Sequence, residues 1–429
     1  MVRPRGALAG VVGATFVSSA GNTATVVAAP FFVLSLGGGP AQVGLAAAAA
    51  SAPVVVGSVL GGVLVDRLGH RRTSVASDVA SGTTSLAVAV LALTTGLPFA
   101  AFCALLVLGA LVDAPGQSAR LVMLPRLATR ADVPLQRAVG LGSGAERLGQ
   151  MLGAPLGGLL VVGVGPEGAF ATTAAGFAVS AVLVLACAPA GRVLAPTDVP
   201  GAPDRPDDAP AQGFWRDLLE GAQALRRIPV LAFVAVVCLV LNLLDAARWS
   251  VLLPLHADAV LGGAAAVGLV LGALSAGSVG GAVLYGTVGH RLPHRGTFVL
   301  AFVLTGGPTS VALATGASLP VLVVVAAAAG LSGGVLNPLI GVLRLQLCPP
   351  HLLARVDGLV RAAAWSGIPV GTLLAGALAG PLGLATCFAA IGVVYVAVAL
   401  VPLVGRPWPT APPDGVGTRA AGAAAAART

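Results

Sequence analysis

The sequence predicts an all-α membrane protein in which twelve transmembrane helices form two pseudo-symmetric six-helix bundles. Composition is the first reason: 57% of the 429 residues are hydrophobic and 9% are charged. In soluble domains about 45–50% of the residues are apolar and about 25% are charged. The second reason is the number of long apolar runs, and the third is a repeat of motifs between the two halves. Together they exclude a soluble enzyme, a nucleic-acid-binding module and a disordered chain.

The apolar runs are each long enough to cross a bilayer, which takes about 20 mostly apolar residues in a helix. Short connectors such as Gly96-Leu97-Pro98 and Gly165-Pro166 separate them, and Gly and Pro in such places mark turns. The twelve predicted spans cover residues 9–36, 42–65, 73–96, 98–119, 138–164, 168–189, 230–254, 264–288, 297–317, 319–343, 358–380 and 383–404.

The spans group into two bundles joined by one long polar segment. We predict an N-terminal bundle over residues 1–190, a cytoplasmic linker over 191–228, a C-terminal bundle over 229–404 and a disordered cytoplasmic tail over 405–429. The linker is rich in Pro and Asp, and its last part has an apolar helical face formed by Phe214, Leu218, Ala222 and Leu225. This part is predicted either to lie on the membrane surface or to form a short solvated helix.

The arginines predict the orientation of the spans. All 24 basic residues are arginines, and with 16 acidic residues they give a formal net charge of +8. They gather in alternate connectors, and positive residues stay on the cytoplasmic side of a membrane. We therefore predict a multi-pass plasma-membrane protein with both termini in the cytoplasm and no nucleic-acid partner. Only two arginines, Arg147 and Arg248, fall well inside predicted spans.

Neither a metal nor an organic cofactor is expected. The five cysteines all lie in apolar runs, and none of them stands in a CxxC motif or near a His at metal-ligand spacing. The five histidines lie at span ends or in connectors, so we predict no enzymatic centre in the membrane. The chain also lacks the G-x-x-x-x-G-K-[ST] loop of ATP-binding proteins, which leaves a proton gradient as the predicted energy source.

The second half of the chain echoes the first at an offset of about 220 residues. Gly69-His70-Arg71 recurs as Gly289-His290-Arg291, and a shift of 218 places Gly149 on Gly367 and Gly153 on Gly371. Two halves of equal orientation joined by a linker are the parallel-repeat architecture of secondary transporters.

The connector after the second span carries a charged motif, which reads G-V-L-V-D-R-L-G-H-R-R from residue 62 to residue 72. It resembles the major facilitator superfamily signature G-x-x-x-D-R-x-G-R/H-R-R, and the matching residues are Gly62, Asp66, Arg67, Gly69, Arg71 and Arg72. Asp66 places a carboxylate at the membrane edge, where arginines or a helix N-terminus can meet it. The resemblance implies the major facilitator fold and a latch that holds the halves in the outward-facing state. The second half has Gly286 and Thr287 where Asp66 and Arg67 stand, so only the first copy can form a charged latch.

The fifth span carries a glycine pattern that resembles the antiporter motif of the same superfamily, G-x8-G-x3-G-P-x2-G-G. Its residues are Gly140, Gly149, Gly153, Pro155, Gly157 and Gly158, with the proline one position later than in the family. Gly149, Gly153 and Gly157 form a stripe that permits close helix packing, which is also the simplest alternative reading. The resemblance implies an exporter. Span 4 and its connector resemble the branch that includes enterobactin-type siderophore exporters and multidrug antiporters, although the usual arginine of the fourth-span motif is missing.

Ionisable and amide side chains inside spans are candidates for proton coupling or substrate contact, because a charge in a bilayer is costly and usually functional. Asp245 and Arg248 are three residues apart and are predicted to pair, with Asn242 on the same face. Glu146 and Arg147 are adjacent, so they point about 100° apart and each needs another partner. Glu146 is the preferred proton carrier. Asp113 is a further candidate for proton coupling or substrate contact, but it lies with Asp78 toward the cytoplasmic ends, where support of the latch is the preferred interpretation. Asn22 is a candidate for substrate contact.

These observations favour a proton-coupled exporter of drug-like, siderophore or other natural-product molecules that works by alternating access. A span interior with few charges suits an amphiphilic substrate. The expected partners are the lipid bilayer and that substrate, and the protein is expected to be monomeric. The alternatives are a nutrient importer or facilitator of the same fold, and a membrane sensor or scaffold without transport.

Overall fold

The computed structural model describes residues 4–188, 228–348 and 353–404. Within them the chain is almost entirely helical. The predicted linker helix and the predicted tail after residue 404 lie outside the described residues.

The N-terminal half begins with four long helices, α1 (Pro4–Ser35), α2 (Pro40–Leu68), α3 (His70–Thr94) and α4 (Phe99–Ala131). They are followed by α5 (Leu135–Cys187), whose 53 residues form two limbs because the backbone leaves the helical conformation at Gly165. Gly165 has φ 77°, a left-handed value that favours glycine, and Pro166 begins the second limb. The predicted turn between spans 5 and 6 is therefore confirmed.

The C-terminal half begins with a long interrupted helix. It comprises α7 (Pro229–Ala246), the π-helix η2 (Ala247–Leu252), α8 (Leu253–His256) and the π-helix η3 (Ala257–Leu261). The remaining elements are α9 (Ala264–Val288), η4 (Gly289–Arg291), α10 (His294–Ala314), α11 (Leu319–Leu347), α12 (Leu353–Leu382) and α13 (Leu384–Val404). Among the described residues, ten helices are long and apolar enough to cross a membrane. The second limb of α5 and the 29-residue α2 complete the twelve predicted spans.

One predicted boundary is wrong in a way that affects function. Span 4 was expected to end at residue 119, with Arg120 in the connector, but α4 continues to Ala131. Arg120 lies inside the helix and is 3% exposed. The helix tolerates it because Asp78 on α3 supplies a carboxylate at 2.8 Å. Local hydropathy places the end of a span at an arginine, because it contains no information about a carboxylate on another helix, such as that of Asp78.

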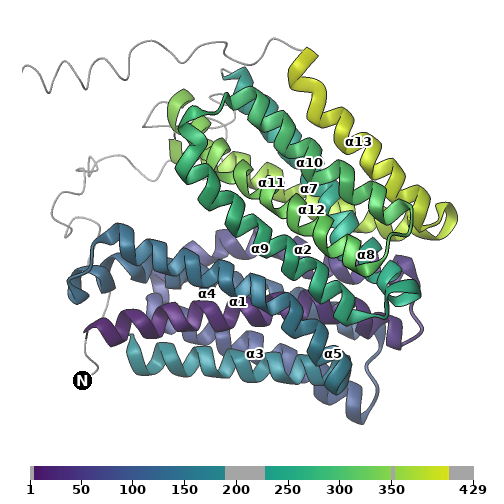
Figure 1. Cartoon of the computed structure of the whole chain (residues 1–429). Coiled ribbons are helices and arrows are strands. Elements are labelled where there is room, and N and C mark those ends of the chain that lie inside the picture. The colour runs from purple at the N-terminus through teal and green to yellow at the C-terminus, as the bar shows by residue number, and fades with distance from the viewer. Residues whose placement is uncertain (1–3, 189–227, 349–352, 405–429) are drawn as a thin grey trace, which may run out of the picture.

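The two halves meet at two glycine crossings near one end of the molecule (Figure 1). In the α5–α9 crossing, a Cβ added to Gly158 would lie 2.5 Å from the carbonyl oxygen of Ala264, and one added to Gly268 would lie 2.8 Å from that of Ala154. From these contacts the halves diverge toward the other end, where α1 starts.

The α2–α12 crossing is the pseudo-symmetric partner of the first. A Cβ on Gly376 would lie 2.8 Å from the carbonyl oxygen of Pro40, and one on Gly44 would lie 2.6 Å from that of Thr372. Pro40 and Gly44 precede Ala264 and Gly268 by 224 residues, and Ala154 and Gly158 precede Thr372 and Gly376 by 218. The internal repeat therefore extends to the contacts between the halves.

An arginine at the start of one helix binds the end of another in each half. Arg71 on α3 donates to the carbonyl oxygen of Leu185 on α5 at 2.5 Å. Arg295 on α10 donates to the carbonyl oxygens of Pro402 and Leu403 on α13 at 2.5 and 2.8 Å. Both arginines lie at the diverging end, where they satisfy the free carbonyls of a helix C-terminus.

Candidate functional site

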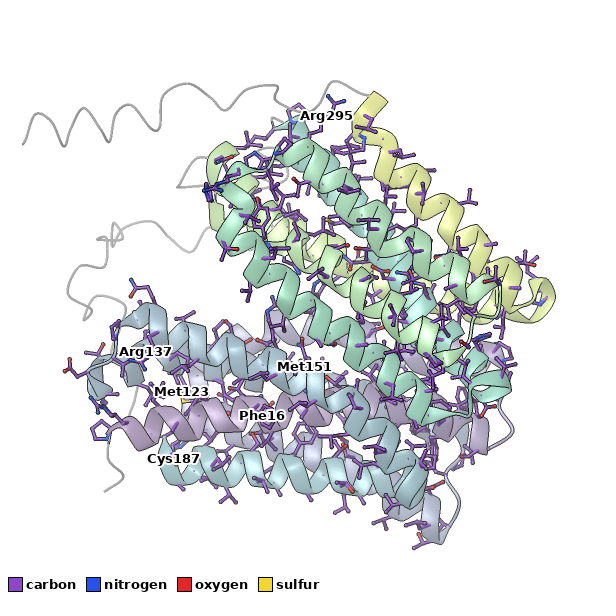
Figure 2. The ribbon with its side chains drawn as sticks, viewed as in Figure 1. Phe16, Met123, Arg137, Met151, Cys187 and Arg295 are labelled. Atoms are coloured by element: carbon purple, nitrogen blue, oxygen red, sulfur yellow. The ribbon has the colours of Figure 1, made fainter. Side chains whose placement is uncertain are left out.

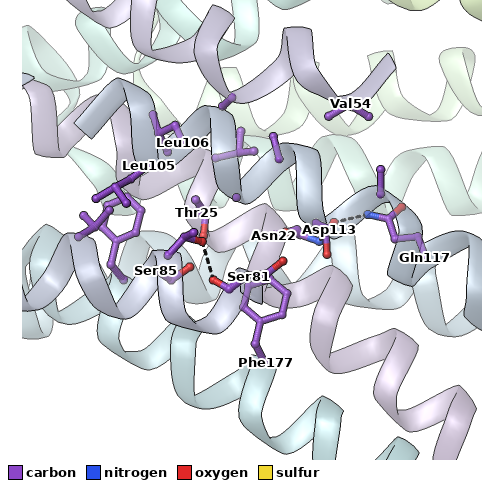
Figure 3. Close-up of a pocket in the computed structure, with 18 residues that line it drawn as sticks. Asn22, Thr25, Val54, Ser81, Ser85, Leu105, Leu106, Asp113, Gln117 and Phe177 are labelled. Carbon is purple, nitrogen blue, oxygen red and sulfur yellow. Dashed lines mark hydrogen bonds between the residues drawn. The ribbon is translucent and has the colours of Figure 1, made fainter. Parts of the chain in front are cut away.

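A cavity of about 210 Å³ lies inside the N-terminal half, between α1, α2, α3, α4 and the second limb of α5 (Figure 3). Apolar side chains such as Val54, Leu106 and Phe170 form much of its wall. Its polar lining comes from α1, α3 and α4, and consists of Asn22, Thr25, Ser81, Thr84, Ser85, Asp113 and Gln117. This combination suits a ligand or a group of water molecules that needs a few hydrogen bonds in an apolar setting.

Asp113 is the charged group of this cavity. Its carboxylate is 7% exposed. The oxygen Oδ2 accepts hydrogen bonds from the amide of Asn22 on α1 at 2.9 Å and from that of Gln117 at 2.6 Å. The other oxygen, Oδ1, is buried and has no hydrogen-bond partner. Asp113 is thus bound by neutral amides, and no cation of the described residues lies within ion-pair distance of it.

A buried ion pair lies next to this cavity. Arg120 donates to Asp78 on α3 at 2.8 Å and to the hydroxyl of Ser18 on α1 at 2.9 Å. Asp78 also accepts a hydrogen bond from Ser180 on the second limb of α5 at 2.8 Å. With Asp78 only 1% exposed, one guanidinium connects four elements in the interior of the N-terminal half.

Asp113, Gln117 and Arg120 share one face of α4, because they are spaced by four and three residues. This face carries two of the three charges of the interior network, Asp113 and Arg120, and α3 carries the third, Asp78. Among the described contacts, Asp113 lines the cavity with Asn22 and Asp78 pairs with Arg120. The side chain of Asp66 lies outside the described residues, so support of the latch by Asp113 and Asp78 stays a prediction. Arg120 is not among the residues predicted from the sequence. Its spacing of seven residues from Asp113 would have placed both side chains on one face of a longer fourth helix.

The C-terminal half has its own buried cation in α7 and η2. Arg248 is fully buried and forms the predicted ion pair with Asp245, which is confirmed. Arg248 also donates to the hydroxyls of Thr309 and Ser310 at 2.7 and 3.2 Å, and to the carbonyl oxygen of Gly306 at 3.0 Å.

Aromatic rings complete this cluster. The Arg248 guanidinium lies 4.5 Å from the ring centroid of Trp249 and 5.3 Å from that of Tyr395, within the range of cation–π attraction. The Tyr395 hydroxyl donates to Asp245 at 3.3 Å, so the cluster joins α7, η2, α10 and α13. Asn242 is half-buried on the same helix. Since both terminal nitrogens of the Arg248 guanidinium are bound by protein groups, we interpret this cluster as structural.

The latch residues are only partly described. Gly69 has φ 83° and makes the turn between α2 and α3, as expected. Arg67 and Arg72 are exposed, and Arg71 binds the end of α5. The surroundings of Gly62 and the side chain of Asp66 lie outside what the structure describes, so the role of both residues in a latch stays a prediction.

The glycine stripe of α5 packs on α1. Added Cβ atoms on Gly149, Gly153 and Gly157 would lie 2.6 Å from the carbonyl oxygen of Phe16, 2.5 Å from that of Ala20 and 2.7 Å from the Cα of Ala24. The predicted close packing is therefore confirmed.

Other residues of the motif behave differently. Gly158 and Pro155 face α9, since a Cβ on Gly272 would meet the Pro155 ring at 2.6 Å. Gly140 has open space around it. The motif thus serves both packing within the first half and contact with the second.

Glu146 and Arg147 are exposed, as is Gln150 one turn later. Glu146 lies seven residues before Gly153, and Gln150 lies seven before Gly157, so helical periodicity places both on the side of α5 that carries the glycine stripe. Figure 2 shows Met151 of the same segment at the side of the first half that faces the second. Glu146 is therefore not enclosed by the described residues, and its role as proton carrier stays a prediction.

No group of three or more His, Cys, Asp or Glu side chains that could hold a metal occurs in the part of the chain that the structure describes. The polar network instead consists of hydrogen bonds and single ion pairs.

Sequence comparisons place these features in a known family. The profile described as Major Facilitator Superfamily matches residues 11–263 and 236–427. The chain is 32% identical over 390 residues to "Multidrug efflux pump Tap" of Mycolicibacterium fortuitum, covering 90% of this chain and 92% of that protein. It is 31% identical over 397 residues to the protein of the same name from Mycobacterium tuberculosis, covering 90% of each.

Solved structures share the fold. A POT family transporter in complex with 5-aminolevulinic acid matches with a TM-score of 0.69 at 14% identity, over 92% of this chain and 95% of that chain. The nucleoside transporter NupG matches with a TM-score of 0.67 at 13% identity, over 93% and 98% of the two chains. At such identities the likeness concerns the fold alone.

Proposed function

Because this chain belongs to the major facilitator superfamily, we propose that it is a proton-driven exporter of amphiphilic, drug-like small molecules in the plasma membrane. Two proteins that match about 90% of the chain bear the name of multidrug efflux pumps, which favours export over nutrient import. The observation that carries the proposal is the pair of glycine crossings, because it gives two similar halves a common line of contact about which they can rock.

The proposed cycle alternates access between the two ends of the molecule. The diverging end carries Arg71, Arg137 and Arg295, and positive residues favour the cytoplasmic side. In this orientation both termini are cytoplasmic and the described conformation is open inward. Closing that end would separate the glycine crossings, with the motif around Asp66 and Arg67 latching the closed end.

The substrate class follows from the distribution of charge. Arg248 and Arg120 are already paired with Asp245 and Asp78, so neither is available to hold an anionic substrate. The cavity offers amides, hydroxyls and apolar walls, which suit neutral or weakly cationic amphiphiles. Siderophores belong in a test panel as a second candidate class.

Reconstitution tests this proposal. Liposomes containing the protein with an acidic interior are expected to accumulate ethidium, about tenfold per pH unit for one-for-one exchange with protons. A proton ionophore should abolish the accumulation, and protein-free liposomes are the matched control. Accumulation that requires an acidic exterior would instead identify an importer, and equilibration indifferent to pH would identify a facilitator.

A further inference from the structure

We propose that Asp113 carries the coupled proton, on its unpartnered oxygen Oδ1, in the polar cavity of the N-terminal half; this inference rests on the proton-driven function proposed above. The carboxylate alternates between an ionised form held by the amides of Asn22 and Gln117 and a neutral carboxylic acid.

The charges described in the interior of the N-terminal half do not balance. The charged groups of the described network are Asp78, Arg120 and Asp113, which amount to two carboxylates and one guanidinium. Arg120 is committed to Asp78 at 2.8 Å and donates no hydrogen bond to Asp113 that the structure shows. A buried carboxylate without a cation is costly, and adding a proton removes the charge.

Among the described residues, no other helix around the cavity supplies a neutralising cation. From α1 the neighbour is Asn22, from α3 the hydroxyls of Ser81 and Thr84, and from the second limb of α5 the ring of Phe177. The described lining contributed by α2 is apolar. Asp113 can therefore become neutral only by binding a proton or a cationic ligand.

The cavity also provides a place for the proton to arrive. Its volume of about 210 Å³ exceeds the roughly 10–15 Å³ that one water molecule requires, and four hydroxyl side chains line it. A proton moves from water on one side of the membrane to Oδ1, and later from Oδ1 to water on the other side. Asn22 on α1 and Gln117 on α4 bind Oδ2 in the described conformation, which leaves Oδ1 free for this exchange.

Glu146 is the rival carboxylate, and its environment differs. It is exposed on α5 beside the exposed Arg147. Its carboxylate is not enclosed by protein, whereas that of Asp113 is buried without a cation among the described residues, where an ionised form is costly. Asp113 thus replaces Glu146 as our preferred proton carrier.

The test compares Asp113→Asn with Glu146→Gln in full-length protein. In weakly buffered detergent solution, ethidium binding to the wild type and to E146Q is expected to release protons, detected with a pH-indicator dye. D113N should bind ethidium without this release. In liposomes, D113N should lose the accumulation of about tenfold per pH unit.

A second variant keeps the inference testable if D113N folds poorly. Asn22→Ala removes one donor to the carboxylate, so the pH midpoint of proton release should move to higher pH, while E146Q leaves it unchanged. Proton release that persists in D113N, or a midpoint that shifts with E146Q and not with N22A, overturns the assignment. Failure of the wild type to use a pH gradient would instead refute the proposed function.

Discussion

Replacing Arg120 with alanine is expected to destabilise the protein by about 3–5 kcal/mol, because it leaves a buried carboxylate without its cation. Asp78 is 1% exposed and would retain only the hydroxyl of Ser180 among its described hydrogen-bond donors. The hydroxyl of Ser18 would also lose its guanidinium. The free energy of unfolding in detergent, from denaturant titration of wild type and R120A, measures the effect.

A double substitution separates charge from packing. Asp78→Asn combined with Arg120→Gln removes both charges, so it should recover most of the stability that R120A loses, because no uncompensated charge remains. The opposite result is a free energy of unfolding for R120A within about 1 kcal/mol of the wild-type value. The ion pair would then stabilise the protein no more than an exposed one does, and the description of a buried ion pair in the N-terminal half would be wrong.

Gly158→Val and Gly376→Val are expected to prevent the inward-open arrangement. Their Cβ positions lie 2.5 and 2.8 Å from carbonyl oxygens of the opposite half, so the added side chains clash with backbone. Overpacking costs about 1–3 kcal/mol, which corresponds to a shift of about 5- to 150-fold in the population of the two arrangements. Transport should fall, and a cysteine placed at the separated crossing should react faster with a water-soluble maleimide.

Gly140→Val is the matched control for the crossing variants. Gly140 lies on the same helix as Gly158, but no atom is within 4 Å of its added Cβ. G140V should therefore transport at the rate of the wild type. If G158V and G376V also do so, with unchanged cysteine reactivity, the crossings are not the contacts that change during transport.

The span pattern could be predicted because it depends on local composition. Twenty apolar residues in a row require a helix in a membrane, whatever lies around them. The pairing of Asp245 with Arg248 was equally local, since three residues on a helix bring side chains together. The glycine stripe that contacts α1 followed from the same periodicity.

The interior of the N-terminal half could not be predicted in the same way. The contact between Arg120 and Asp78 joins residues 42 positions apart, and the contact between Asn22 and Asp113 joins residues 91 apart. Such pairs depend on which helix faces which, and one sequence does not fix that. As a result the sequence places Arg120 in a connector, whereas it lies in the interior of the N-terminal half on the same face of α4 as Asp113.

We propose that the two halves rock about the glycine crossings during transport. Distances between labelled residues of opposite halves, measured at each end of the molecule, test this motion. After replacement of the five native cysteines, spin labels at Arg137 and His290 report the diverging end, and labels at Val164 and Val260 report the crossing end. Under conditions that drive transport, pulsed electron paramagnetic resonance should show the first distance shortening as the second lengthens. Two distances that stay fixed while substrate is transported, or that change in the same direction, would contradict the account.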